Sequence, residues 1–321
     1  MTTRVQFDRN GDIDELHTAE VEVPETGPGQ VRVQVLYAGL NPVDLTILSG
    51  GFGPAKGTRG VGMDFSGIVA EVGEGVEDFS PGQLVFGGYP NHSQAETLLI
   101  KDPEKRLDAI PKGLGTDVAG GLYIAGRTAI SGIRAIAPAA GETVFVSGAS
   151  GGVGIIAAQL ALGLGLGARV IGTASADNLQ LLRALGIDAI EYGDGLEDRL
   201  RAAAPNGIQA AYSTRGEDEI ALLLGLGVPA DRINSIAAGP EVAEKLGVHT
   251  SGEAVAQRGD LAWLAKAIAY GHVFVPIGGV FPLTEVQDAY RFLRAGHPIG
   301  KVLLKMAPKP FTEEQRTFLT S

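Results

Sequence analysis

The stretch that most constrains the fold of this chain is a short apolar run that ends in a cluster of glycines. Residues 143–147 read Thr-Val-Phe-Val-Ser, a β-branched and aromatic run typical of a strand buried on both faces. A glycine-rich turn follows over residues 148–154, and a helical pattern of apolar residues continues over Val153–Leu162. A strand, a tight glycine turn and a helix in direct succession predict the start of an α/β domain.

After this turn, strand and helix signals alternate along the chain. The predicted strands are 168–174, 189–192, 208–213 and 232–238, and the predicted helices between them are 176–185, 196–203 and 217–224. Alternating β and α elements are joined by right-handed crossovers, which place successive strands parallel in one sheet. The sequence therefore predicts a doubly wound parallel sheet.

The first third of the chain predicts antiparallel β structure instead. Apolar and polar side chains mostly alternate over residues 31–37, which is the period of a half-buried strand. Two further strand regions, 63–76 and 83–87, are separated by glycine and proline turn signals. Short strands at close spacing favour a small barrel or sandwich.

Helical spacing of small apolar residues marks residues 116–140, between these two regions. Near the end of the chain, Thr284-Glu-Val-Gln287 has the pattern of a capping box and predicts a helix that runs to Arg294. Residues 301–306 predict a last strand.

Composition and charge exclude several classes of function. The 321 residues carry a net charge of −11, which repels nucleic acid and anionic membranes, so we expect neither as a main partner. The absence of cysteine excludes disulfides, a thiol nucleophile and thiolate-bound zinc or iron–sulfur clusters. The first residues contain no apolar stretch like a signal peptide, and residues 153–166 are too short and too glycine-rich to span a membrane. We therefore expect a cytoplasmic protein.

The glycine turn has the spacing of a dinucleotide-binding fingerprint, with alanine at the first position. Gly151 would let the backbone approach a diphosphate, and Gly154 would let the helix pack closely on the strand. Free N–H groups and the helix dipole would hold the phosphates, which explains how an acidic protein binds an anion. The candidate cofactor-binding residues here are Ala149, Ser150, Gly151, Gly152, Val153 and Gly154. The alternative is a tight strand–helix turn that binds nothing.

The choice between NAD and NADP depends on the end of the next strand. An NAD site places Asp or Glu roughly 20 residues beyond the motif, on the ribose 2′-hydroxyl. Ser175 occupies that position, and a hydroxyl can donate to a 2′-phosphate that a carboxylate would repel. NADPH is therefore the expected cofactor, although Asp177 lies two residues on and no Lys or Arg lies between Arg169 and Arg183. Ser175 is also a suitable N-cap for the helix that follows.

Two common kinds of dehydrogenase chemistry do not fit the residues present. A short-chain dehydrogenase needs Tyr and Lys four residues apart, and none of the seven tyrosines has Lys at that spacing. A zinc alcohol dehydrogenase needs Cys, His or carboxylate ligands around a Lewis acid. The chain has no cysteine, and its five histidines form no close-spaced pair.

The sequence resembles the medium-chain dehydrogenase/reductase superfamily, in its zinc-free branch of quinone oxidoreductases and enoyl reductases. The likeness covers nearly the whole chain. It is carried by Gly39-Leu-Asn-Pro-Val-Asp44, Gly62-Met-Asp-Phe-Ser-Gly67, Pro81-Gly82, Gly126-Arg-Thr-Ala129, the Ser147–Gly154 turn, Gly172-Thr-Ala-Ser175 and Gly300-Lys-Val-Leu-Leu304.

The resemblance implies a GroES-like β domain plus a Rossmann doubly wound parallel sheet. The GroES-like catalytic domain would comprise residues 1–120 and 270–321, and the Rossmann domain residues 121–269. The nicotinamide would lie in the cleft between them. Where zinc members carry their Cys and His ligands, this chain has Asn41 and Met63, so no metal site is expected.

The resemblance also implies roles for single residues. Asn41 and Thr128 would contact the nicotinamide end of the cofactor, although a turn amide and a helix hydroxyl are the alternatives. Tyr192 would lie near the adenosine end, or be a strand-end aromatic. Lys301 would lie near the cleft, and Ile236 completes the cofactor-binding set. Arg127 stands at a position that is normally apolar, where it would hold a substrate oxyanion or pair with a surface carboxylate.

For a metal-free member, the expected reaction is hydride transfer from NADPH to the β-carbon of a conjugated carbonyl in a small apolar substrate. The enolate needs hydrogen-bond donors, and a proton must then reach the α-carbon. The tyrosines that relatives use appear here as Phe52 and Thr46. The proton would then come from water, from the substrate, or from Tyr89 or His92.

Several alternatives stay open. The two missing phenols motivate the hypothesis that an enolate, if not protonated quickly, attacks a second electrophile in the same substrate, which is a reductive cyclisation. Quinone reduction is an alternative in the same class, and a non-catalytic NADPH-binding protein is an alternative in another. A homodimer is expected through residues 272–276 as an apolar edge strand, unless that strand is covered within its own subunit.

Overall fold

The computed structural model describes residues 1–163, 167–296 and 298–307. Its contacts divide the chain into two compact units. The first unit contains residues 1–124, 261–269 and the part of 276–321 that the structure describes, and the second contains residues 125–260 and 270–275. This division differs from the predicted domains at three short segments, because residues 121–124 and 261–269 group with the first unit and residues 270–275 with the second.

The second unit is built on a five-stranded parallel sheet in the order β11-β10-β9-β12-β13. Its strands are β9 (Thr143–Val146), β10 (Arg169–Ala174), β11 (Asp188–Glu191), β12 (Ala210–Ser213) and β13 (Ile233–Ser235). The chain winds outward from β9 in one direction and then from β12 in the other. The carboxyl ends of β9 and β12 therefore form the switch point at which doubly wound sheets bind ligands.

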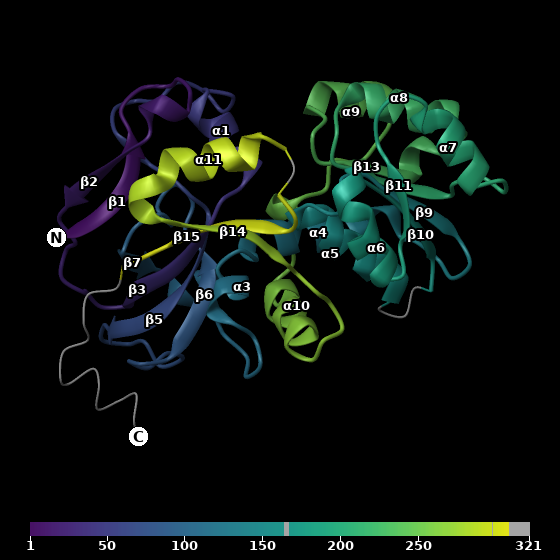
Figure 1. Cartoon of the computed structure of the whole chain (residues 1–321). Coiled ribbons are helices and arrows are strands. Elements are labelled where there is room, and N and C mark those ends of the chain that lie inside the picture. Colours follow the sequence, from purple (N-terminus) through teal and green to yellow (C-terminus); the bar gives the residue numbers. More distant parts are fainter. Residues whose placement is uncertain (164–166, 297, 308–321) are drawn as a thin grey trace. The chain divides into compact units, whose positions relative to one another are not determined.

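Helices cover both faces of this sheet, as Figure 1 shows. The helices are α4 (Tyr123–Ile136), which begins in the first unit, and α5 (Gly152–Gly163), α6 (Leu179–Ala184), α7 (Leu196–Ala203), α8 (Glu217–Gly225) and α9 (Pro240–Leu246), with 3-10 turns η2 (Ala176–Asn178), η3 (Ala230–Arg232) and η4 (Glu253–Val255). Phe145 and Ile171 of the sheet share one buried cluster with Leu200 of α7 and Leu223 of α8. The predicted doubly wound sheet is confirmed, with somewhat shorter strands than the pattern indicated.

The first unit is mostly antiparallel β structure. Its strands are β1 (Thr2–Phe7), β2 (His17–Val21), β3 (Gln30–Gly39), β4 (Arg59–Gly60), β5 (Asp64–Val72), β6 (Leu84–Gly88), β7 (Thr97–Lys101), β8 (Leu107–Ala109), β14 (Ile277–Pro282) and β15 (Lys301–Lys305). One sheet has the order β2-β1-β4, and the other runs β14-β15-β3-β5-β6-β8 with β7 also paired to β3. The pairing of β15 with β3 joins the C-terminal part of the chain to the N-terminal part.

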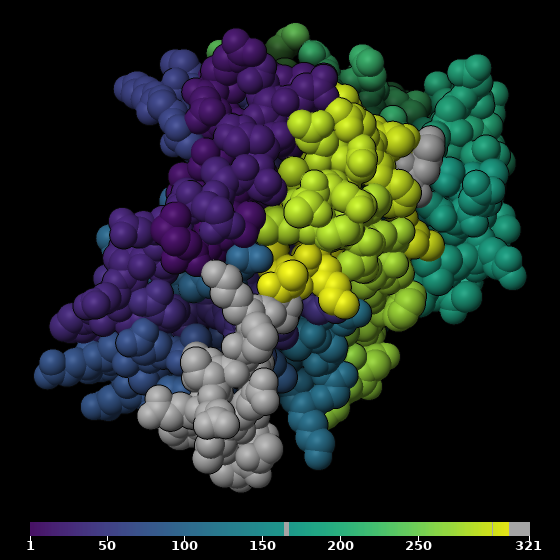
Figure 2. All heavy atoms as spheres, turned by 60° about the vertical axis from the view of Figure 1, so that its left-hand side comes forward, coloured from purple at the N-terminus to yellow at the C-terminus, as the bar shows by residue number. Residues whose placement is uncertain are grey.

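Among the described residues, the helices that belong wholly or mainly to the first unit are α1 (Pro42–Leu48), α2 (Pro103–Arg106), α3 (Thr116–Ala119), α10 (Asp260–Ala269) and α11 (Val286–Arg294), with 3-10 turns η1 (Ile13–Glu15) and η5 (Leu283–Glu285). Figure 2 shows α11 against the N-terminal segment. Gln287 Nε2 donates to Leu16 O at 2.9 Å, and Arg291 and Arg294 pair with Asp14 and Asp12.

Two local predictions are wrong. The helix that ends at Arg294 has no capping box, because it begins at Val286 after a 3-10 turn and its N-cap side chain makes no capping bond. Residues 272–276 are not a strand of the parallel sheet. Instead, the backbone N–H and C=O of Phe274 bond the side chain of Gln159, each at 2.8 Å.

Candidate active site

Two hydrogen bonds fix the glycine turn of the second unit to the neighbouring strand, and a third closes the turn on itself. Gly148 has φ +56°, and its N–H donates to Thr173 Oγ1 at 3.2 Å. The Ala149 N–H donates to Thr173 O at 2.8 Å, and the Gly151 N–H closes the turn onto Gly148 O at 2.9 Å. The turn is therefore preformed at the carboxyl ends of β9 and β10.

Gly154 is required by close packing. A Cβ at this position would lie 2.2 Å from Gly148 O and 3.0 Å from Ala149 Cα. The first N–H groups of a helix have no carbonyl partner within it. Here the Ile155 N–H donates to Gly151 O, so the N–H groups of Gly152 and Val153 come before the first hydrogen bond of the helix. The predicted motif therefore has the glycine packing and the N–H groups that fit a diphosphate.

Ser175 and Tyr192 lie side by side beyond this turn. The Tyr192 N–H donates to Ala174 O at 3.2 Å, which places the residue after β11 next to the residue after β10. Ser175 occupies the N-cap position of η2, but its side chain makes no capping hydrogen bond there. In the same segment, Asn178 Nδ2 donates to Ser150 Oγ at 3.2 Å, which ties the loop to the glycine turn.

Of the remaining candidates of the second unit, Ile236 and Thr128 lie near the end of β12, and Arg127 pairs with Glu253. The Ile236 N–H donates to Ser213 O at 3.1 Å. Thr128 is buried on α4, and its carbonyl accepts the hydroxyl of Tyr212 at 3.1 Å. Arg127 NH1 lies 3.1 Å from Glu253 Oε1, so its guanidinium is paired with a carboxylate in this structure.

Sequence reasoning missed two charged residues at the same end of the sheet. Glu219 is buried and accepts a hydrogen bond from Ser213 Oγ, and burial raises the pKa of its carboxyl group. The Arg215 guanidinium lies over the ring of Tyr192, with 5.0 Å between its Cζ and the ring centroid. Neither residue belongs to a local motif, so only the fold reveals its position.

In the first unit, Asn41 is held by a buried ion pair. Lys301 Nζ donates to Asn41 Oδ1 at 2.6 Å and to Leu40 O at 2.9 Å. The same ammonium lies 3.2 Å from Asp64 Oδ2, which accepts the Asn41 side-chain amide at 3.1 Å. The Asn41 side chain therefore has a defined orientation, with a cation on its oxygen and a carboxylate on its nitrogen.

A second buried carboxyl group adjoins this cluster. Asp44 Oδ2 accepts the Asn41 N–H at 2.9 Å and the Tyr290 hydroxyl at 3.0 Å. Gln94 Nε2 donates to the Tyr290 oxygen at 2.6 Å. Burial, with the Asp64 carboxylate nearby, raises the pKa of Asp44 to about 7. Burial also raises the pKa of Tyr290 well above its usual range.

These residues do not fit a zinc ion. A catalytic zinc needs three protein donor atoms around one open centre, but the Asn41 oxygen and the Asp64 carboxylate already coordinate the Lys301 ammonium. Within the described residues, no group of three His, Cys, Asp or Glu side chains is arranged to hold a metal ion.

The other proton-donor candidates lie in the same unit. The rings of Tyr89 and His92 are 5.0 Å apart, and Arg106 lies over the Tyr89 ring. Burial, with the charges of Arg4 and Arg106, lowers the pKa of His92. The two positions without a phenol are at the surface: Phe52 is 68% exposed, and the Thr46 hydroxyl faces its own helix, 3.4 Å from Pro42 O.

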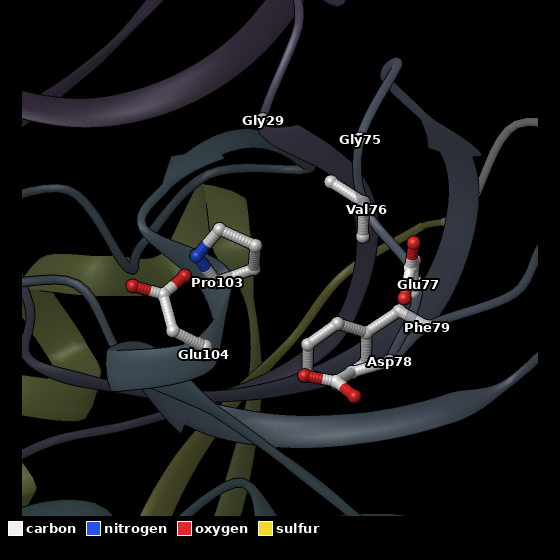
Figure 3. A pocket seen from close by; sticks show the side chains of 8 residues that line it. All are labelled: Gly29, Gly75, Val76, Glu77, Asp78, Phe79, Pro103 and Glu104. Atoms are coloured by element: carbon white, nitrogen blue, oxygen red, sulfur yellow. The ribbon is translucent and has the colours of Figure 1, made fainter.

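A cavity of about 280 Å³ in the first unit lies apart from these residues. It is lined by Gly29, Gly75, Val76, Glu77, Asp78, Phe79, Pro103 and Glu104 (Figure 3). Its three ionisable side chains are all acidic, so it would repel an anionic cofactor. None of the candidate residues lines it.

Comparisons with known proteins agree with this geometry. Residues 27–124 match the family model described as an alcohol dehydrogenase GroES-like domain, and residues 188–304 match the one described as a zinc-binding dehydrogenase.

None of the helices among the described residues has the length and apolar character that a membrane span requires.

Three similar proteins illustrate the relationship. The chain is 30% identical over 309 residues to an NADPH-dependent alkenal/one oxidoreductase of Arabidopsis thaliana, covering 90% of this chain and 75% of that protein. It is 28% identical over 324 residues to an acryloyl-coenzyme A reductase of Metallosphaera sedula, covering 89% and 95%. The solved quinone oxidoreductase of Coxiella burnetii is 26% identical, with a TM-score of 0.83 over 95% of this chain and 99% of that one.

Proposed function

Because the chain belongs to the medium-chain dehydrogenase/reductase superfamily, in its quinone oxidoreductase-like branch, we propose that it is an NADPH-dependent, metal-independent reductase of an activated C=C bond. The substrate is a small apolar enone or enoyl compound. When bound, NADPH supplies the hydride to the β-carbon.

The observation that carries the proposal is the preformed glycine turn. Gly154 leaves no space for a Cβ, and the turn is held to β10 through Thr173. A preformed cradle of N–H groups gives an acidic chain a local site for a diphosphate. The names of two relatives, an NADPH-dependent alkenal/one oxidoreductase and an acryloyl-coenzyme A reductase, support reduction of a C=C bond next to a carbonyl.

The cluster around Asn41 supports chemistry without a metal. Lys301 donates a hydrogen bond from its ammonium group to the Asn41 oxygen, so the amide nitrogen is polarised as a hydrogen-bond donor. In the proposal, Asn41 and Thr128 contact the nicotinamide end, and each is tested by its own alanine variant. Arg127 contributes only if its pairing with Glu253 opens.

The test is NADPH oxidation with a panel of enones, enoyl thioesters and quinones, followed by product analysis. We expect NADPH loss with at least one enone or enoyl compound and a product saturated at the α and β carbons. Binding of NADPH without turnover on any member of the panel would favour the non-catalytic alternative. Failure to bind either nicotinamide nucleotide would overturn the proposal.

Quinone reduction is the second candidate, because the quinone oxidoreductase of Coxiella burnetii has the same fold over nearly the whole chain. A hydroquinone product with no saturation of enones would favour it. Reductive cyclisation remains a hypothesis that Phe52 and Thr46 motivate. A saturated product without a new ring, formed from the native substrate, would remove it.

We propose a homodimer as part of this function. In the segment 272–276, Val273 and Val275 are buried while Phe274 is 50% exposed. Nearby, Tyr270 is 75% exposed. Apolar side chains that gather at a surface are suited to a second copy of the same chain. Sedimentation should show a dimer that Phe274→Glu dissociates, and a monomeric wild-type protein would contradict it.

A further inference from the structure

We propose that Arg215 reads the 2′-phosphate of the cofactor and so makes the chain prefer NADPH to NADH. The inference rests on the proposed function, which requires a nicotinamide nucleotide but does not say which residue recognises the extra phosphate. It names a specificity-determining residue outside every local motif of the sequence.

Arg215 follows a strand that is not adjacent to the strand before Tyr192. Tyr192 follows β11 and Arg215 follows β12, and the two strands between them are β10 and β9. The guanidinium nevertheless lies over the Tyr192 ring. It therefore reaches across the carboxyl ends of β9 and β10, the two strands that lead into the glycine turn and Ser175.

Ser175 lies close to this position. The Tyr192 N–H donates to Ala174 O, so the backbone of Ser175 lies beside that of Tyr192, whose ring lies beneath Arg215. The Ser175 hydroxyl is not used as a helix cap and can donate to a phosphate. A hydroxyl and a guanidinium next to each other are the donors that a phosphate dianion requires.

Arg199, which lies on α7 just after the Tyr192 loop, already has partners. Arg199 donates to Glu191 O, Gly193 O and Asp194 O, so it fixes the loop that carries Tyr192. Arg169 begins β10 and pairs with Asp188 at the start of β11, at 2.6 Å, so it lies at the opposite, amino end of these strands.

The stacking on Tyr192 limits how the Arg215 side chain can move. Burial raises the pKa of the Glu219 carboxyl group, and the Arg215 charge lowers it. A guanidinium stacked on an aromatic ring keeps its N–H edge in a fixed plane. Stacking on the Tyr192 ring thus keeps the Arg215 guanidinium in an orientation that can bind an anion.

The experiment measures binding without catalysis. Isothermal titration calorimetry of the full chain with adenosine 2′,5′-bisphosphate and with 5′-AMP isolates the 2′-phosphate, and titrations with NADPH and NADH repeat the comparison on whole cofactors. Arg215→Ala should weaken binding of the bisphosphate and of NADPH roughly 10- to 100-fold, the range for one charge-assisted pair. It should change 5′-AMP and NADH binding less than about twofold.

Two further variants test whether the effect is specific to the guanidinium of Arg215. Arg215→Lys keeps the charge but loses the planar fork, so it should retain part of the preference. Arg201→Ala removes the same charge from an exposed site on α7, where Arg201 pairs with Glu197 at 2.7 Å, and should leave the preference unchanged. Equal weakening of both nucleotides by Arg215→Ala, or no weakening, would overturn the inference while leaving the proposed function in place. A wild-type protein that binds neither nucleotide would overturn both.

Discussion

Lys301 and Asp64 form a buried ion pair in the first unit. The Lys301 side chain is 4% exposed and the Asp64 side chain with which it pairs is fully buried. Removing one partner of a buried ion pair leaves the other charge without compensation, whereas removing both does not.

Lys301→Met should therefore lower the free energy of unfolding by about 3–5 kcal/mol. The double variant with Asp64→Asn should recover part of that loss, because no buried charge is left unpaired. Urea denaturation of the wild type, both single variants and the double variant measures the coupling between the two positions. Strictly additive effects would show that the two groups do not stabilise each other.

Asp44 makes stability depend on pH. Its pKa rises from 3.8 to about 7 in the folded protein, next to Asp64, Lys301 and Tyr290. Between these two values the folded chain holds a proton that the unfolded chain has lost. The free energy of unfolding therefore falls as the pH rises through this window, and the effect ends above about pH 7.

Asp44→Asn cannot ionise, so the variant should gain stability relative to the wild type as the pH rises from about 4 to 7, and the difference should then level off. The new amide nitrogen would replace Asp44 Oδ1, which has no hydrogen-bond partner in the described structure, and this cost does not depend on pH. Urea midpoints at several pH values measure the difference. A difference that stays constant with pH would show that Asp44 does not titrate in this range.

The sequence predicted the glycine turn but not the polar cluster, for a physical reason. The turn is formed by neighbouring residues, so its spacing is visible directly. Lys301 and Asn41 are separated by 260 positions, and Tyr290 and Asp44 by 246. Pairs this distant meet only because β15 lies beside β3 and α11 packs on residues 12–16.

The periodicity of apolar residues predicted where most strands and helices lie. It did not predict how helices begin, because side chains there bond residues far along the chain. The predicted capping box at residues 284–287 failed because the Gln287 side chain has other partners: its Nε2 donates to Asp14 O and Leu16 O, and its Oε1 accepts from Arg291. In the same way, Ser175 takes the N-cap position without its capping bond. A side chain at a helix end can bond a neighbour in the sequence or a residue far along the chain, and only the first kind of partner is visible in the sequence.

The junction of β9 and α5 depends on Gly154. A Cβ there would overlap Gly148 O at 2.2 Å, so Gly154→Ala should shift the turn, destabilise the chain by about 1–3 kcal/mol and weaken NADPH binding at least tenfold. The control is Gly163→Ala at the end of the same helix, where a Cβ meets nothing within 4 Å. That variant should keep wild-type binding and gain up to about 1 kcal/mol. Equal binding by both variants would contradict the role of the turn.

At the scale of the whole molecule, the two ends of the chain build one unit and the middle builds the other. Each unit has its own buried cluster. The expected GroES-like and Rossmann architectures are both present, since local periodicity distinguishes antiparallel from βα segments. The exact boundaries were not predictable, because residues 261–269 resemble any amphipathic helix until their contacts are known.

The last prediction concerns what the whole protein needs for turnover besides NADPH. The Asn41 oxygen and the Asp64 carboxylate, which a metal would need as ligands, are bound to the Lys301 ammonium. This cation is part of the chain, so a chelator cannot remove it. Dialysis against EDTA and 1,10-phenanthroline should therefore leave the rate of NADPH oxidation within about twofold, and the thermal midpoint unchanged. NADPH added at 100 times its Kd should raise the free energy of unfolding by about 2.7 kcal/mol in the same samples, which shows that the dialysed protein is intact. Loss of turnover that zinc restores would show that a metal ion takes part and that the ammonium does not replace it.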